Sequence, residues 1–405
     1  PGSQRQLDVQ QRQQRRSHPE PRHLDLPGDF SEPCCDFERW MAELSRSTGA
    51  DVLDSVQQSH WPVVKLVAIA KNEAPYIPLW VYHHFRIGID LIEIHINNTD
   101  DNSIRICKRI KQINKNFNYV KSDPLFRQSS KAGRLFQIDA YNQSLKTSKV
   151  GDDQATHLLV LDLDEFLTPK SLEGNIKSLI QASPSTDIFS FLWYSDDYKA
   201  AKAPFSLPFQ TKMSIHRMDH VKSMAKISSD LISCNHHNFI FRETYNPTNQ
   251  FAEHTKTLLS DERNTTIKRS KLNHEFLNTL EEQKPEAWFV LHCVYRSEIE
   301  YLSSLSRGRG HNNDSRPIKS NRWGLQAYPM YPSKEIILSI APAQLRSYRR
   351  NYNLFKRNAK LLGKIKRARR YALDRAEALE KLISQNQNIL NTFKCCFAGT
   401  KYDQN

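Results

Sequence analysis

The segment that decides the fold reads Leu159-Val160-Leu161-Asp162-Leu163-Asp164-Glu165-Phe166-Leu167. Its apolar start is typical of a buried strand, which is expected to end at Asp162. Three acids then fall within four positions, and carboxylates crowded in this way repel one another unless a cation compensates them. Divalent cations prefer such oxygen ligands, so the segment predicts a metal or phosphate site directly after a core strand. The other interpretation is an exposed acidic turn.

Strands and helices alternate along the chain ahead of this segment. Apolar runs predict strands at residues 63–70, 91–96, 117–121 and 157–161, and helical spacing predicts helices at 75–87, 103–114 and 131–148. Such alternation indicates βαβ units and a largely parallel sheet, hence an α/β fold. Ligands of such sheets bind beyond the carboxyl ends of the strands, where the acids lie. After about residue 200 the pattern is irregular, and we expect a loop-rich half that completes the site.

Composition and charge exclude several classes of protein. The 405 residues are 39% hydrophobic, which permits a sizeable core and excludes collagens and small disulfide scaffolds. No apolar run reaches the ~18 residues of a membrane-spanning helix. The cysteines form no disulfide framework and no secretion signal is evident, so a cytoplasmic protein is expected. The net charge of +14 favours an anionic partner.

Three regions are expected along the chain. Residues 1–58 are poor in aliphatic side chains and should form a largely disordered tail and linker. Residues 59–330 hold the α/β domain, and residues 331–405 form a basic helical extension. Within this extension, residues 346–381 carry 13 Lys and Arg against three acids, and their apolar spacing predicts an amphipathic helix with a cationic face. Such a helix can lie on an anionic membrane surface, bind nucleic acid, or pack on the α/β domain with its charges solvated.

An ordered series of motifs surrounds the acidic segment, and Gln137 lies on the helix before it. The motifs are Ala70-Lys71-Asn72-Glu73-Ala74-Pro75, Asn97-Asn98-Thr99-Asp100-Asp101-Asn102-Ser103, Val221-Lys222-Ser223-Met224-Ala225-Lys226 with His236-His237, and Leu291-His292-Cys293-Val294-Tyr295-Arg296-Ser297 with Arg307-Gly308. Their order and spacing resemble the glycosyltransferase family 2-like and family 92 group across about residues 63–312. The resemblance implies the GT-A fold, a Rossmann-like, mostly parallel sheet flanked by helices.

The resemblance implies a metal-dependent glycosyltransferase. Such an enzyme moves a sugar from a nucleotide sugar, here a UDP- or GDP-sugar, to a glycan or lipid-linked acceptor by an inverting displacement. The chain would work in the cytoplasm, and peripherally on the cytoplasmic face of a membrane if the 346–381 helix binds anionic lipid. The competing functions are a phosphatase and a basic nucleic-acid-binding protein, although nucleic acid is not the partner we expect.

The phosphatase alternative uses the same two aspartates. In haloacid-dehalogenase-like phosphatases Asp162 would be the nucleophile and Asp164 the acid/base, but Phe166 stands where Thr or Val is usual. That class also carries its Asp pair on the first strand, whereas a whole βαβαβα block precedes the pair here. The upstream motifs therefore favour the glycosyltransferase.

The resemblance also implies a donor site. Lys71, Asn72, Glu73 and Asp101 would line the nucleotide pocket, and Arg134 and Arg307 would reach the diphosphate. Asp162 and Asp164 would hold Mn²⁺ or Mg²⁺ and, through the metal, the diphosphate. His292 would complete the metal site or else be a structural histidine. Removing one of the crowded acids should stabilise the metal-free protein, because repulsion disappears.

The acceptor side needs a base on the attacking hydroxyl, usually a carboxylate. Asp196 and Asp197 follow the apolar run 188–194 and are the candidates, with a solvated turn as the other interpretation.

Overall fold

The computed structural model describes residues 61–129, 135–197, 202–245, 247–251, 287–307, 318–319, 322–325 and 335–403, with residue 285 and three two-residue strands between 257 and 272. The chain divides into two units, and every described residue belongs to the second, Ala42–Asn405. The segment 1–58, for which disorder is predicted, and Arg134 lie outside the described residues.

Four parallel strands form the first half of the sheet and confirm the alternation read from the sequence. They are β1 (Val64–Ala70), β2 (Leu91–Ile96), β3 (Phe117–Lys121) and β4 (His157–Val160), in the spatial order β3-β2-β1-β4. Because β1 pairs in parallel with both β2 and β4, Ala70 lies opposite Ile96 and Val67 opposite Val160. The carboxyl ends of these strands therefore meet at one edge of the sheet, where α/β proteins bind ligands.

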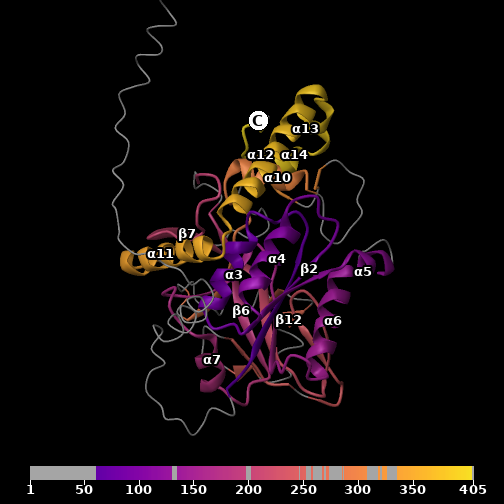
Figure 1. The fold of residues 1–405 in the computed structure, drawn as a ribbon, viewed down its shortest axis with the longest axis vertical. Helices are drawn as coiled ribbons and strands as arrows, with labels where there is room; N and C mark the ends of the chain where they lie inside the picture. The colour runs from indigo at the N-terminus through magenta and orange to yellow at the C-terminus, as the bar shows by residue number, and fades with distance from the viewer. Residues whose placement is uncertain are drawn as a thin grey trace, which may run out of the picture. The chain divides into compact units, whose positions relative to one another are not determined.

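Helices connect these strands and flank the sheet (Figure 1). They are α3 (Ile77–Arg86), α4 (Ser103–Ile113), α5 (Asp123–Gln128), α6 (Phe136–Lys149) and α7 (Ile176–Ala182). α3 buries Trp80 and Val81 completely, and α6 places Tyr141 and Leu145 in a core with Val67 of β1. This sheet, with its parallel first half and flanking helices, is the predicted α/β fold class with a Rossmann-like arrangement.

The second half of the sheet is mixed and contains a strand that the sequence did not predict. β7 (Lys212–Lys226) pairs antiparallel with β4 and with β6 (Ile188–Asp196). β14 (Trp288–His292) runs parallel to β6 and antiparallel to β5 (Glu165–Pro169), which follows the acids. The expectation of a loop-rich half after residue 200 is therefore wrong for this part. The remaining short strands are β8 (Leu231–Cys234), β9 (Phe239–Phe241), β10 (Asn249–Phe251), β11 (Thr257–Leu258), β12 (Ile267–Lys268) and β13 (Lys271–Leu272).

The C-terminal segment packs against the sheet and its helices. It comprises β15 (Glu335–Ser339), which pairs with β7, and helices α11 (Pro342–Asn358), α12 (Leu362–Gln385), α13 (Asn388–Thr392) and α14 (Lys394–Phe397). α11 buries Tyr348 and Tyr352 against Tyr82 of α3, with ring centroids 5.2 and 5.3 Å apart. α12 buries Leu379 and Ile383 in a core shared with α10 (Glu298–Leu305), which it crosses in Figure 1.

This packing matches one of the three interpretations of residues 346–381, namely helices packed on the α/β domain. Their apolar face is covered by protein, while basic side chains such as Arg350 and Arg367 are exposed. The segment is thus a packed pair of helices with solvated charges, and its apolar face is not available for burial in lipid. Within the described part of the chain, no helix is long and apolar enough to cross a membrane.

We expect α12 to contribute to the stability of the whole described fold. Leu379→Ala should lower the free energy of unfolding by about 2–5 kcal/mol, because it leaves a cavity in the shared core. Leu382→Ala on the same helix is the matched control; Leu382 is 37% exposed and Leu379 only 2%. Its expected effect is much smaller. Equal effects of the two substitutions in chemical denaturation would contradict a core that includes α12.

Candidate functional site

The turn between β4 and β5 carries the three acids and is fixed by their own hydrogen bonds. Asp162 N donates to Glu165 Oε2 (2.8 Å), and Glu165 N donates to Asp162 O (3.0 Å). From α3, the buried Trp80 Nε1 donates to Asp162 O and Glu165 O, at 3.1 and 2.8 Å. The turn therefore presents Asp162 and Asp164 at the carboxyl end of β4 in a defined geometry.

Lys222 of β7 compensates two of these carboxylates. Its side chain is 1% exposed, and its Nζ lies 2.9 Å from Glu165 Oε2 and 3.5 Å from Asp162 Oδ2. Burial acts to lower the pKa of Lys222, but Asp162 and Glu165 outweigh burial and raise it, so the ammonium stays charged. On its other side, Asp162 Oδ1 accepts a hydrogen bond from Gln137 Nε2 of α6 (3.0 Å). Gln137 is the residue that the sequence places on the helix before the acids.

Asp164 faces a second group of partners. Its Oδ2 lies 3.4 Å from His292 Nε2 and 3.8 Å from Arg322 Nη2. Burial acts to raise the pKa of Asp164, but His292, Arg296 and Arg322 hold it well below its ordinary value. His292 ends β14 and stacks on Trp193, with ring centroids 4.2 Å apart. Burial lowers the pKa of His292, although Asp164 acts to raise it.

Both aspartates line a cavity of about 220 Å³, which we call the β4 cavity. Six of the residues predicted for the site line it together: Lys71, Glu73, Asp162, Asp164, His292 and Arg307. Gln137 and Trp193 also line it, as do two cations that the sequence analysis did not single out, Lys319 and Arg322. The cavity thus combines a pair of carboxylates with a group of basic side chains.

The basic side chains of the β4 cavity depress one another's pKa values. Arg307 forms an ion pair with Glu73, yet burial, Arg375 and Arg322 together lower the pKa of Arg307 to about 9. Burial, with Arg322 and Arg307, lowers the pKa of Lys319 well below its ordinary value, and burial and Arg307 lower that of Lys71. A bound polyanion would relieve this repulsion, so the arrangement favours anions such as a diphosphate.

Asn72 and Asp101 organise the loops beside the cavity and do not line it. Asn72 has a positive φ of 54°, and its Oδ1 accepts hydrogen bonds from Asp100 N (2.7 Å) and Asp101 N (3.2 Å). Asp101 accepts from Ala74 N and from Ser103 N and Oγ. Asn tolerates the left-handed region because its short polar side chain bonds locally. These two residues therefore join the loops that follow β1 and β2.

Asp196 and Asp197, the candidates for the acceptor base, lie outside the β4 cavity. Asp196 is 3% exposed, and its carboxylate accepts hydrogen bonds from Tyr295 N, Arg296 N and Lys202 Nζ. A carboxylate engaged by three donors fixes the turn after β14 and is poorly placed to take a proton. Asp197 Oδ1 lies 3.9 Å from His216 Nε2. The structure thus gives Asp196 a structural role.

The donor atoms around Asp162 and Asp164 fit a divalent cation. Within the described residues, no three His, Cys, Asp or Glu side chains are grouped as a preformed metal site. A diphosphate-bound metal does not need one, because Mg²⁺ is usually held by one or two carboxylates together with substrate phosphates. Asp162, with a side chain 39% exposed, and Asp164 would supply the carboxylates, and His292 would supply an imidazole.

The functional side chains that the sequence did not reveal come from the second half of the chain. Lys319 and Arg322 lie in a segment without regular pattern, and no motif marks them. Lys222 stands in the motif Val221–Lys226 and Trp193 in the apolar run 188–194, but only the pairing of β6 and β7 with their neighbours brings them to the acids. A local sequence signal for Lys319 and Arg322 is not evident.

Comparisons with known proteins give only distant likenesses. No family model and no curated protein matches the chain. Among solved structures, the mannosyltransferase PcManGT from Pyrobaculum calidifontis, in complex with GDP-Man and Mn2+, is 13% identical, with 88% of this chain and 86% of that chain covered and a TM-score of 0.29. HddC from Yersinia pseudotuberculosis is 14% identical over 40% of this chain and 76% of that chain, with a TM-score of 0.25. At these sequence identities and TM-scores neither likeness assigns an activity to the chain.

Proposed function

We propose that the chain is a metal-dependent glycosyltransferase that binds a nucleotide sugar in the β4 cavity. One observation carries the proposal: Asp162 and Asp164 share a cavity at the carboxyl end of β4 with Lys71, Arg307, Lys319 and Arg322. Carboxylates alone would attract only a cation, and basic side chains alone only an anion. Their combination fits a metal bridged to a diphosphate.

The chain's own residues would divide the work at the diphosphate. Lys71, Arg307, Lys319 and Arg322 would bind its oxygens, and the planar guanidinium groups of the two arginines can each make two parallel hydrogen bonds. The bound metal would act as a Lewis acid on the leaving diphosphate. Gln137 and Lys222 hold Asp162, at 3.0 and 3.5 Å, in the orientation that a metal ligand needs.

For the acceptor we propose a hydroxyl of a glycan or glycolipid. Its oxygen would attack the anomeric carbon in line with the departing nucleoside diphosphate and give its proton to a base, so that the anomeric configuration inverts. Asp196 is engaged by three donors. Asp197, whose Oδ1 lies 3.9 Å from His216 Nε2, is therefore the predicted base that we propose for the acceptor hydroxyl.

Donor binding should be accompanied by proton uptake. Burial, Arg322 and Arg307 lower the pKa of Lys319 well below its ordinary value. A diphosphate beside it raises that pKa and favours proton uptake by the amine. Calorimetric titration of UDP-glucose and GDP-mannose at about pH 8 in buffers of different ionisation enthalpy measures the uptake. Lys319→Met should reduce it, with Lys71 and Arg307 accounting for the remainder, and proton release by the wild-type protein would contradict the assignment.

A thermal-shift screen tests the proposed function. Nucleotide sugars should raise the melting temperature with Mn²⁺ and much less with a chelator, because a ligand that binds only the folded state stabilises it by mass action. Stabilisation by none of the nucleotide sugars, together with hydrolysis of a simple phosphate ester that Asp162→Asn abolishes, would instead support the phosphatase alternative.

A further inference from the structure

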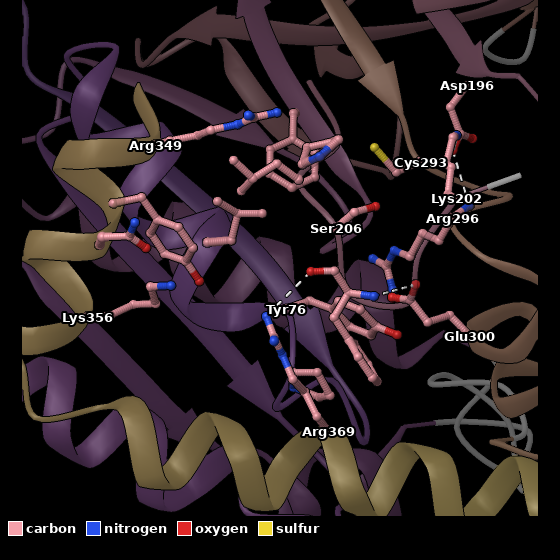
Figure 2. A pocket seen from close by; sticks show the side chains of 18 residues that line it. Tyr76, Asp196, Lys202, Ser206, Cys293, Arg296, Glu300, Arg349, Lys356 and Arg369 are labelled. Atoms are coloured by element: carbon pink, nitrogen blue, oxygen red, sulfur yellow. Dashed lines mark hydrogen bonds and ion pairs between the residues drawn. The ribbon is translucent and has the colours of Figure 1, made fainter. Parts of the chain in front are cut away.

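A second cavity, of about 250 Å³, lies between α3, the loop at 202–208 and the two long C-terminal helices. Its walls are largely apolar, with Leu79, Phe166, Phe205 and Tyr352 among them. Figure 2 shows three basic side chains, Arg349 and Lys356 of α11 and Arg369 of α12, extending from the helices toward this cavity. We call it the helix cavity. It is separate from the β4 cavity, although Arg296 lines the helix cavity and lies 3.9 Å from Glu73 of the β4 cavity.

The three basic side chains have no carboxylate partner among the residues that the structure describes. Lys356 Nζ lies 4.6 Å from the centre of the Tyr352 ring. Arg369 lies over the Phe205 ring at 5.2 Å and donates to Phe205 O (3.4 Å), while its Nε is buried without a hydrogen-bond partner. Burial and the neighbouring Arg369 and Arg357 lower the pKa of Lys356. Arg349 is exposed, but the half-buried Lys356 and the orphaned Nε of Arg369 are costly unless an anion joins them.

The two carboxylates in the wall cannot supply that compensation, because each is already engaged. Asp196 binds Lys202 and the backbone of Tyr295 and Arg296. Glu300 Oε2 accepts hydrogen bonds from Ser297 N, Ser297 Oγ and Phe205 N. Phe205 has a φ of 58°, so Glu300 holds it in a conformation that is strained for a bulky residue. The aromatic wall of the helix cavity is therefore built at a cost in backbone strain.

We propose that the helix cavity binds an amphiphile made of an apolar chain that ends in a phosphate. The apolar walls would take the chain, and Lys356 and Arg369 would bind the phosphate. These two side chains lie close enough for Arg369 to lower the pKa of Lys356. Arg and Lys are the usual phosphate-binding side chains, and charge-assisted hydrogen bonds are the stronger ones. Nucleic acid fits less well, because its chain of phosphates needs an extended basic groove and this cavity holds one small apolar volume. The inference does not depend on the function of the β4 cavity.

Calorimetric titration with three probes tests the chemistry of the site. Decyl phosphate carries both an apolar chain and a phosphate, inorganic phosphate has the charge alone, and decyl maltoside has the chain alone; both detergents are used below their micellar concentrations. We expect decyl phosphate to bind at least about tenfold more tightly than either of the others. Equal affinity for inorganic phosphate, or for decyl maltoside, would overturn the proposal.

Matched variants locate the site. Lys356→Gln and Arg369→Gln should each weaken decyl phosphate binding by about tenfold. Arg350→Gln and Arg367→Gln remove the same charge from exposed positions on the same helices and should leave it unchanged. Melting temperatures show whether each variant is folded. Equal losses in all four variants would mean unspecific attraction to a basic surface, and loss on Asp164→Ala alone would mean binding in the β4 cavity; either result contradicts the proposal.

Discussion

Asp164→Ala is expected to abolish metal-dependent binding of a nucleotide sugar. Residues that only orient metal ligands typically contribute about 10–100-fold to metal affinity, so the loss of a direct ligand should weaken donor binding in Mn²⁺ by at least about 100-fold. Binding without metal should change little. Calorimetric titration of UDP-glucose and GDP-mannose, with Mn²⁺ and with a chelator, measures both quantities.

The control is Glu335→Gln, which removes an exposed carboxylate at the start of β15. It should leave donor affinity unchanged. If Asp164→Ala and Glu335→Gln bind donor equally well in Mn²⁺, Asp164 is not a metal ligand.

For Asp164→Ala, the structure leads us to expect the opposite effect on stability from the one that the sequence predicted. Crowding of acids predicted that removing one would stabilise the metal-free protein, but Asp164 lies beside His292 and Arg322 and its pKa is lowered in the folded state. A carboxylate with a lowered folded-state pKa stabilises the fold above its unfolded-state pKa of about 3.9, and this contribution is lost as the pH falls through the folded-state pKa. We therefore expect Asp164→Ala to lower the stability at pH 7, with a smaller difference in acid.

Lys222→Met should be strongly destabilising. It leaves Glu165, which is fully buried, and Asp162 without their compensating cation. Burial raises the pKa of Glu165 to about 8 even beside Lys222, so without the lysine this carboxyl takes up a proton at neutral pH and stays buried without its partner. Leaving a buried polar group unpaired typically costs about 1–3 kcal/mol. Urea denaturation of the purified variant measures this loss.

Two further variants make this experiment specific. Lys226→Met changes an exposed lysine on the same strand and should alter stability by no more than about 0.5 kcal/mol. Adding Glu165→Gln to Lys222→Met should recover part of the loss, because it removes the buried carboxyl that Lys222 pairs with. A Lys222→Met variant as stable as Lys226→Met would contradict the buried pair.

The first half of the fold could be predicted because its elements carry local signals. β1 to β4 are short apolar runs separated by amphipathic helices, and the bounds expected for β2 and β3 coincide with those observed. The acidic turn was predictable for the same reason, since it comes just after the apolar residues of β4. Its position at the carboxyl edge of the sheet then follows from parallel pairing.

The second half depends on long-range pairing that no local pattern reveals. In β7, polar residues such as His216, Arg217 and Lys222 separate the few aliphatic ones, so its period-two signal is weak. The residue type of Lys222 and its motif do not indicate burial. In the structure β7 pairs with β4, and Lys222 is fully buried against Glu165. Asp196 likewise resembled a catalytic carboxylate, and only its three donors show that it fixes a turn.

The affinity of the wild-type protein for UDP and GDP, measured with and without Mn²⁺, tests most directly whether the β4 cavity binds a diphosphate through a metal. Lys71, Arg307, Lys319 and Arg322 should give measurable binding in a chelator, and Asp162 and Asp164 should make binding at least about 100-fold tighter once Mn²⁺ is added. Calorimetric titration of one protein preparation under both conditions gives the ratio. Equal affinities in Mn²⁺ and chelator, or no binding in either, would contradict the account.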